Sequence, residues 1–222
     1  MGLVMVRRSS LSQAICLSLL CGALFSGAAH AAPDAERWAF WDAHNPTSSE
    51  RVSHQLWQEL LDDYLVTLPD GRTAFRYQAV TTAHRAQLTQ YVQELAARDP
   101  RALNRNEQMA YWINFYNALT IAVVLDNPGK KSILRMGGGW LPRGPWDDAV
   151  TAVAGETLTL NDIEHRILRP IWQDHRIHFA VNCASVGCPN LAATAFTGAE
   201  LETQLQAAEQ DFLGHPRAVS LQ

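Results

Sequence analysis

Two cysteines in the C-terminal half of the chain carry its clearest chemistry. Cys183 and Cys188 are separated by four residues, and His178 and Asn182 come shortly before them. A cysteine attacks as its thiolate, which forms when a neighbouring imidazolium or a helix N-terminus lowers the thiol pKa. Residues 177–182 alternate between apolar and polar positions, which predicts a strand with His178 and Asn182 on one face. This strand would deliver Cys183, the predicted nucleophile, into a tight loop.

The same cysteine pair is open to two other interpretations. A disulfide between Cys183 and Cys188 is sterically feasible, because Gly187 lets the loop turn tightly. A metal site would combine the cysteines with His165 or His178, but this cysteine spacing is not usual for zinc ligands. We therefore expect no metal and no cofactor, while the choice between a free thiolate and a disulfide stays open.

His165 is the histidine best suited to pair with a thiol. It directly follows Glu164 on a short segment whose apolar residues recur at helical spacing. As a general base, His165 would take the proton of the Cys183 thiol, with Glu164 near the other ring nitrogen. A histidine among inward-facing apolar residues is also a common core residue, so this alternative stays open too.

Asn114 and Asn117 lie on the strongest predicted helix, which spans residues 104–125. Asn104 can cap this helix, and Glu107 stands three residues later in the position of a capping box. The helix is apolar nearly all round, so we expect it to be central and buried. A buried amide needs hydrogen-bond partners. Asn114 and Asn117 would therefore brace backbone groups, or else orient a catalytic histidine or an oxyanion.

The remaining pattern predicts a helix-rich α+β fold in a single domain, with a small sheet and a central buried helix. Thr159 or Asn161 would cap the short helix that carries His165, and Pro170 would end it. Residues 126–150 form a long Gly-rich loop. Other helices are predicted over 52–65, 82–97 and 197–212, and short strands over 73–77 and 151–157.

The first 31 residues are typical of a secretory signal peptide. Arg7 and Arg8 precede an apolar run, and Ala29, His30 and Ala31 fit the cleavage pattern. An N-terminal segment and loop at 32–50 and the main domain at 51–222 would follow. We therefore expect a periplasmic or secreted protein, in a compartment where disulfides persist.

The charge pattern excludes two classes of partner. The net charge is −4 without clusters of lysine or arginine, and removal of the leader makes it more negative. This argues against nucleic acid and against anionic membrane surfaces. After the leader, no stretch is long and apolar enough to span a bilayer, so we expect no membrane span. The expected partner is an unknown small molecule or peptide, and the sequence leaves the oligomeric state open.

Four motifs in order resemble the domain of unknown function 547 family. The resemblance covers roughly residues 56–219 and implies no established activity, although fusions of some members with glutaredoxin-like domains point to thiol chemistry. Family members usually continue beyond the segment that resembles His215–Arg217, so the chain looks like a member without its C-terminal end. The motifs are residues 111–120, Pro145–Trp146, 160–169 and 176–189.

Two classes of function follow from these observations. As an enzyme, the protein would be a thiol-dependent hydrolase or acyltransferase acting on an amide or thioester. As a non-catalytic envelope binding module, it would use a Cys183–Cys188 disulfide to stiffen its loop and bind through the Gly-rich loop; a reversible dithiol couple is a further alternative. The predicted site residues are Cys183, His165, Glu164, His178, Asn114 and Asn117.

Overall fold

The computed structural model describes residues 36–138 and 143–218. These residues belong to one compact unit that spans Pro33–Gln222. The predicted signal peptide at residues 1–31 lies outside the described residues. Within the part of the chain that is described, no helix is both long and apolar enough to cross a membrane.

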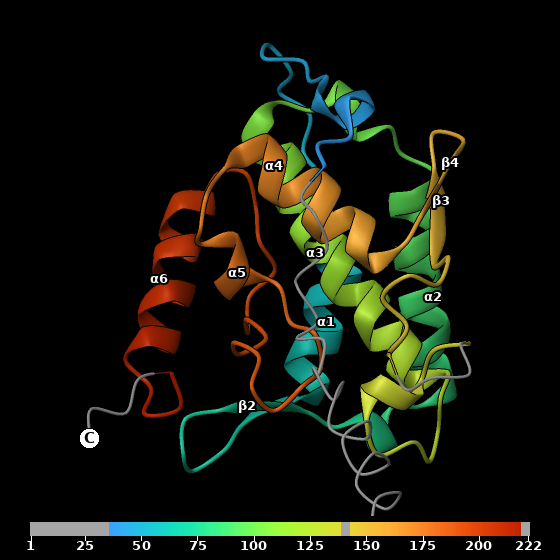
Figure 1. Ribbon diagram of the computed structural model, residues 1–222, viewed down its shortest axis with the longest axis vertical. Helices are drawn as coiled ribbons and strands as arrows, with labels where there is room; N and C mark the ends of the chain where they lie inside the picture. The colour runs from blue at the N-terminus through green and yellow to red at the C-terminus, as the bar shows by residue number, and fades with distance from the viewer. Residues whose placement is uncertain (1–35, 139–142, 219–222) are drawn as a thin grey trace, which may run out of the picture. The chain divides into compact units, whose positions relative to one another are not determined.

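Helix α3 (Arg105–Leu125) runs through the middle of this unit, with the other elements packed around it (Figure 1). Asn104 begins the helix as predicted, because its side-chain oxygen accepts a hydrogen bond from the backbone N–H of Glu107 at 3.1 Å. Sixteen of the 21 helical residues are buried. A helix that is apolar nearly all round has to be covered on every side, and the prediction of a central buried helix is confirmed.

The predicted fold class, helix-rich α+β, is also confirmed. Its small sheet takes the form of two separate antiparallel hairpins: β1 (Leu65–Thr67) pairs with β2 (Thr73–Phe75), and β3 (Thr151–Val153) with β4 (Glu156–Leu158). The other helices in the described residues are α1 (Gln55–Tyr64), α2 (Thr82–Ala96), the π-helix η5 (Asp162–Leu168), α4 (Arg169–Trp172), α5 (Ile177–Ala180) and α6 (Leu201–Leu213), with short 3-10 turns at Ala39–Asp42, Tyr77–Ala79, Pro100–Ala102 and Ile133–Arg135.

Aromatic side chains tie the N-terminal segment and the first two long helices into the core. Trp41 is fully buried and packs edge-on against Trp112 of α3, with ring centroids 5.2 Å apart. Trp57 of α1 stacks on Tyr91 of α2 at 6.2 Å. Such aromatic pairs add to the free energy gained by burying their area, so the first contact fixes the N-terminal segment against the central helix and the second fixes α1 against α2.

The predicted strand at Ile177–Asn182 is wrong, because Ile177–Ala180 form the one-turn helix α5. The backbone N–H groups of this turn find local acceptors; for example, Val181 donates to the carbonyl of Ile177 at 3.2 Å. The buried residues are Ile177, Ala180 and Val181, which is the spacing of a helical face and not the alternation of a strand. In a stretch of six residues both patterns fit, and the local hydrogen bonds decide between them.

The predicted end of the short helix at Pro170 is also wrong. The helix continues through Pro170 as α4, after the π-helical turns of η5. Proline has no N–H, so the carbonyl of Arg166, four residues earlier, is left without its helical partner. The backbone N–H of Trp38 donates to that carbonyl at 2.9 Å. The wide π-helical turn and this tertiary hydrogen bond together accommodate the proline.

Candidate functional site

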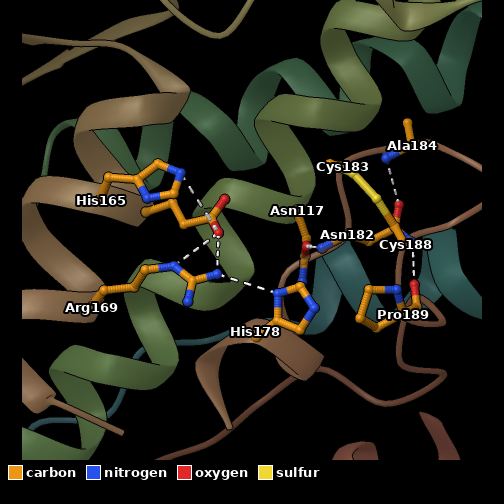
Figure 2. The surroundings of a disulfide bond; sticks show 10 residues. Asn117, His165, Arg169, His178, Asn182, Cys183, Ala184, Cys188 and Pro189 are labelled. Atoms are coloured by element: carbon orange, nitrogen blue, oxygen red, sulfur yellow. Dashed lines mark hydrogen bonds and ion pairs between the residues drawn. A yellow bond between two sulfur atoms is a disulfide. The ribbon is translucent and has the colours of Figure 1, made fainter. Parts of the chain in front are cut away.

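The cysteine loop is closed by a disulfide between Cys183 and Cys188, whose Cα atoms lie 6.1 Å apart (Figure 2). The Asn182 side chain holds both ends of this loop. Its amide nitrogen donates to the carbonyl of Pro189 at 2.7 Å, and its oxygen accepts from the N–H of Ala184 at 2.8 Å. The structure therefore contains the disulfide, which was one of three interpretations of the sequence. The disulfide closes the loop, and the Asn182 side chain fixes its conformation.

The segment from residue 181 to residue 200 has no regular secondary structure, so side chains have to supply partners for its backbone. Asn117 of α3 donates to the carbonyl of Ala180 at 3.0 Å and accepts from the N–H of Asn182 at 2.9 Å. Asn114 donates to the carbonyl of Phe196 at 2.7 Å and accepts from its N–H at 3.0 Å. Each amide thus pairs with the irregular segment much as a neighbouring strand would.

Replacement of either asparagine by alanine is expected to lower the free energy of unfolding by about 1–3 kcal/mol, since each change leaves a backbone donor and a buried backbone acceptor unpaired. Urea unfolding followed by circular dichroism measures this. Gln90→Ala, on an exposed face of α2, is the matched control and should stay within about 0.5 kcal/mol of the parent. An Asn114 or Asn117 variant as stable as the control would contradict the bracing role.

Three further side chains brace the same segment, and the sequence patterns did not reveal them. Gln58 of α1 donates to the carbonyl of Ala193 at 2.9 Å and accepts from the N–H of Ala195 at 2.8 Å. Gln204 of α6 donates to Ala195 at 2.8 Å, and Glu107 accepts from Gly198 at 3.2 Å. A glutamine on a helix face gives no local signal of this role, because its partners lie far away in the sequence.

A second group of polar side chains gathers around the Glu164 carboxylate. Arg169 donates to the Oε1 atom of Glu164 from Nη2 at 2.7 Å and from Nε at 3.1 Å. The Nε2 atom of His165 lies 3.9 Å from that oxygen, and Arg169 Nη2 lies 3.3 Å from Nδ1 of His178. Burial is the main cause that lowers the pKa of both histidines; Arg169 lowers it further, and Glu164 partly opposes the shift. Both rings are therefore neutral at pH 7.

The structure brings these predicted site residues together in two groups and not in one. Figure 2 shows His165 and Arg169 on one side of Asn117 and the disulfide on the other. No hydrogen bond among the described residues joins His165 to either sulfur, and a sulfur in a disulfide is not a thiolate. The His165 ring instead faces Glu164. The catalytic roles of Cys183, His165, Glu164 and His178 stay a prediction. It applies to the protein with its disulfide reduced, since only then does Cys183 carry a thiol.

A cavity of about 340 Å³ is lined by the disulfide loop and by the hairpin of β1 and β2. Ligand pockets in proteins begin at about this size. The loop forms one wall and the hairpin another, and the backbone N–H of Thr73 in β2 donates to Asn190 Oδ1 at 3.0 Å, which ties the two walls together. The lining residues are Leu65, Leu68, Arg72, Thr73, Ala74, Phe75, Tyr77, Asn182, Ala184, Ser185, Val186, Cys188, Pro189, Asn190, Leu191 and Arg217.

The described residues contain no cluster of three or more histidine, cysteine, aspartate or glutamate side chains that could hold a metal ion. Comparison with curated proteins gives no match, and comparison with solved structures gives none. A family described as "Protein of unknown function, DUF547" matches residues 100–213. That range includes the central helix, both polar groups and the disulfide loop. Since the match covers just over half of the 222 residues and includes the motifs that carry the resemblance, the chain belongs to the DUF547 family.

Proposed function

We propose that this protein is an exported binding module that takes a small molecule or a peptide into the cavity beside its disulfide loop. One observation carries this proposal: the loop closed by Cys183 and Cys188 forms a wall of a cavity of about 340 Å³. A periplasmic or extracellular location keeps such a disulfide oxidised. The braces from α3 hold the loop in place, so the cavity exists before any ligand arrives.

The arrangement of the two polar groups supports binding more than thiol-dependent hydrolysis. A hydrolase of that class needs a free thiolate with a base in hydrogen-bond reach. Here the sulfurs are joined to each other, and His165 faces Glu164. The side chains that would orient a base, Asn114 and Asn117, each donate to one backbone carbonyl and accept from one backbone N–H instead.

A thiol/disulfide redox function is the second candidate, and the exposure of the loop favours it. Cys183 and Cys188 are both partly exposed, and the three residues at the tip of the loop are exposed. A redox partner could therefore reach the sulfurs. The two functions differ in the reduction potential that they require, because a structural disulfide resists reduction and a redox couple does not.

The exported protein is expected to contain no free thiol, and the Cys183→Ala/Cys188→Ala double variant should lose about 2 kcal/mol of stability, because the crosslink closes only a short loop. Thiol counting under denaturing conditions and urea unfolding measure the two quantities. In glutathione or dithiothreitol buffers, the bridge of a binding module should be reduced only below about −300 mV. A midpoint above about −250 mV would favour the redox candidate.

Cys183 itself can be tested for the enzyme alternative with the Cys188→Ser variant, which frees its thiol. Alkylation of Cys183 as a function of pH gives its pKa. A midpoint at or above the ordinary value of about 8.5 would leave the nucleophile without support. A clearly lower midpoint would instead favour the hydrolase if His165→Gln returns it to the ordinary value, and it would count against the proposed binding module.

The binding function is tested directly by an NMR-detected screen of small organic compounds against the oxidised protein. We expect hits whose chemical-shift changes map to the cavity, at Thr73, Leu191 and the residues of the disulfide loop. The same hits should bind the double cysteine variant more weakly, because its loop is no longer held closed. Hits that map elsewhere, or binding that is independent of the disulfide, would contradict the proposal.

A further inference from the structure

The cavity beside the disulfide loop is positively charged, although the chain as a whole is acidic. Its lining contains two arginines, Arg72 and Arg217, and no aspartate or glutamate. The whole chain has a net charge of −4. A concave site that contains only cationic charge attracts anions, because its walls exclude water and weaken screening.

The two arginines differ in how far their charge is already compensated. Arg72 donates to the Asp70 carboxylate from Nε at 2.8 Å and forms an ion pair with it through Nη2 at 2.7 Å. Arg217 forms no ion pair with any carboxylate among residues 36–138 and 143–218. Its Nη2 atom donates at 2.8 Å to the neutral side-chain oxygen of Asn190, and its Nε is buried without a partner. The uncompensated cation of the cavity is therefore Arg217.

Arg217 is also held in a defined place. The Asn190 oxygen that accepts from Arg217 also accepts from the N–H of Thr73, and the Asn190 nitrogen donates to the Asp211 carboxylate at 2.7 Å. The guanidinium lies over the ring of Phe212, with Cζ 5.4 Å from the ring centroid. A cation that is fixed before binding loses little side-chain entropy when an anion arrives.

The rest of the cavity is largely apolar. Leu65, Leu68 and Phe75 line it from the hairpin side, and Leu191 lines it from the segment after the disulfide loop. Val186 at the tip of that loop is 78% exposed, which is high for an aliphatic side chain, and it also lines the cavity. A ligand that covers these side chains would remove apolar area from water, including that of Val186.

We propose that this cavity binds a small organic anion, with an apolar body against the hairpin and a single carboxylate on Arg217. The inference rests on the proposed binding function and names its ligand class. One uncompensated guanidinium matches one negative charge, and its planar N–H groups suit a carboxylate. A volume of about 340 Å³ holds a body of the size of an amino-acid derivative or a medium-chain acid.

The test uses two matched pairs of acid and amide: N-acetyl-L-leucine with N-acetyl-L-leucinamide, and octanoate with octanamide. Isothermal titration calorimetry on the full oxidised protein should show at least one acid binding about tenfold or more tightly than its amide. A larger preference for the acid in the leucine pair would indicate a ligand with a peptide C-terminus, and a larger preference in the octanoate pair would indicate an alkyl acid. Equal binding of acid and amide in both pairs would overturn the inference.

Variants of Arg217 separate recognition of charge from a structural role. Arg217→Gln should remove the preference for the acid, leave amide binding unchanged and melt like the parent, while Arg217→Lys should keep part of the preference. Arg135→Gln removes the same charge at an exposed position outside the cavity and should change nothing. An acid preference that survives in Arg217→Gln would overturn the assignment.

The two proposals fail in different ways. If the amides bind in the cavity as tightly as the acids, the binding function holds and the anion inference falls. If none of the four compounds binds, the anion inference falls as well, and the compound screen then decides the binding function by itself. Chemical-shift changes at Thr73 and Leu191 show whether a compound that binds does so in this cavity.

Discussion

Replacement of Glu107 by alanine is expected to lower the free energy of unfolding by about 2–5 kcal/mol, because two backbone N–H donors lose their acceptor. The residue is only 1% exposed. Its Oε1 accepts from the backbone N–H of Val52 at 2.7 Å, and its Oε2 accepts from that of Gly198 at 3.2 Å. Alanine would leave both donors without an acceptor, the one at Val52 in a buried place and the one at Gly198 in a half-buried one. Since Val52 precedes α1 and Gly198 precedes α6, one carboxylate on α3 holds two distant segments together.

Urea unfolding of Glu107→Ala measures this loss, with Glu94→Ala as the matched control. Glu94 is exposed on α2, where its carboxylate accepts from Gln90 at 2.8 Å, so its removal should cost no more than about 0.5 kcal/mol. Glu107→Gln should fall between the two, because its amide can accept one of the N–H groups but turns a donor toward the other. Equal stability of the Glu107 and Glu94 variants would refute the role of this carboxylate.

Gly198→Ala tests the same junction from its other side. A Cβ atom at residue 198 would lie 2.7 Å from the backbone nitrogen of Glu107 and 2.9 Å from its Cα. Backbone atoms of a buried helix cannot move aside easily, so we expect a loss of the same order as for Glu107→Ala. The close approach of Gly198 to α3 is what allows its N–H to reach the carboxylate. Gly155→Ala, which has open space around it but a φ of +85°, would show only the backbone strain of a left-handed residue.

Local sequence rules explain the beginning of α3 but not the use of Glu107. Asn104 followed by Glu107 predicts a capping box, and Asn104 does cap the helix. In a full capping box the Glu107 side chain would return to the N–H of Asn104. It binds Val52 and Gly198 instead, because those segments have no regular structure and need acceptors. Partners so far apart in the sequence leave no trace in a local pattern.

Contacts between residues that are far apart in the sequence also account for the parts of the candidate site that were not predicted. The cysteine pair and the two asparagines stand out by residue type, and the structure places Asn117 directly between the segment that carries the disulfide and the Glu164 group. The cavity did not stand out, because its walls come from a hairpin at 65–75 and a loop at 182–191 that only the fold brings together. Arg217 likewise looks like an ordinary surface residue until its uncompensated charge is seen in the cavity.

The protein is expected to lose about 3 kcal/mol of stability through His54 alone as the pH falls from 7 to 4. His54 is 6% exposed, and its Nδ1 lies 2.6 Å from the hydroxyl of Tyr91. Burial lowers the pKa of His54 from 6.5 to about 4. In the unfolded chain the ring takes up a proton near pH 6.5, whereas in the folded protein it stays neutral until about pH 4. Protons therefore favour the unfolded state within this window, and stability is fully present only above it.

Urea unfolding of the parent and of His54→Gln at pH 7, 6, 5 and 4 isolates this contribution. Glutamine can still accept from Tyr91 but does not titrate, so the variant should lose less stability on acidification than the parent, by about 3 kcal/mol. Half-buried histidines such as His165 affect both proteins alike and cancel in the comparison. Gln90→Ala, an exposed change that does not titrate, is the control and should follow the parent. Parallel pH profiles for the parent and His54→Gln would contradict this prediction. They would show that His54 takes up its proton near pH 6.5 in the folded protein too, so that burial does not disfavour the imidazolium.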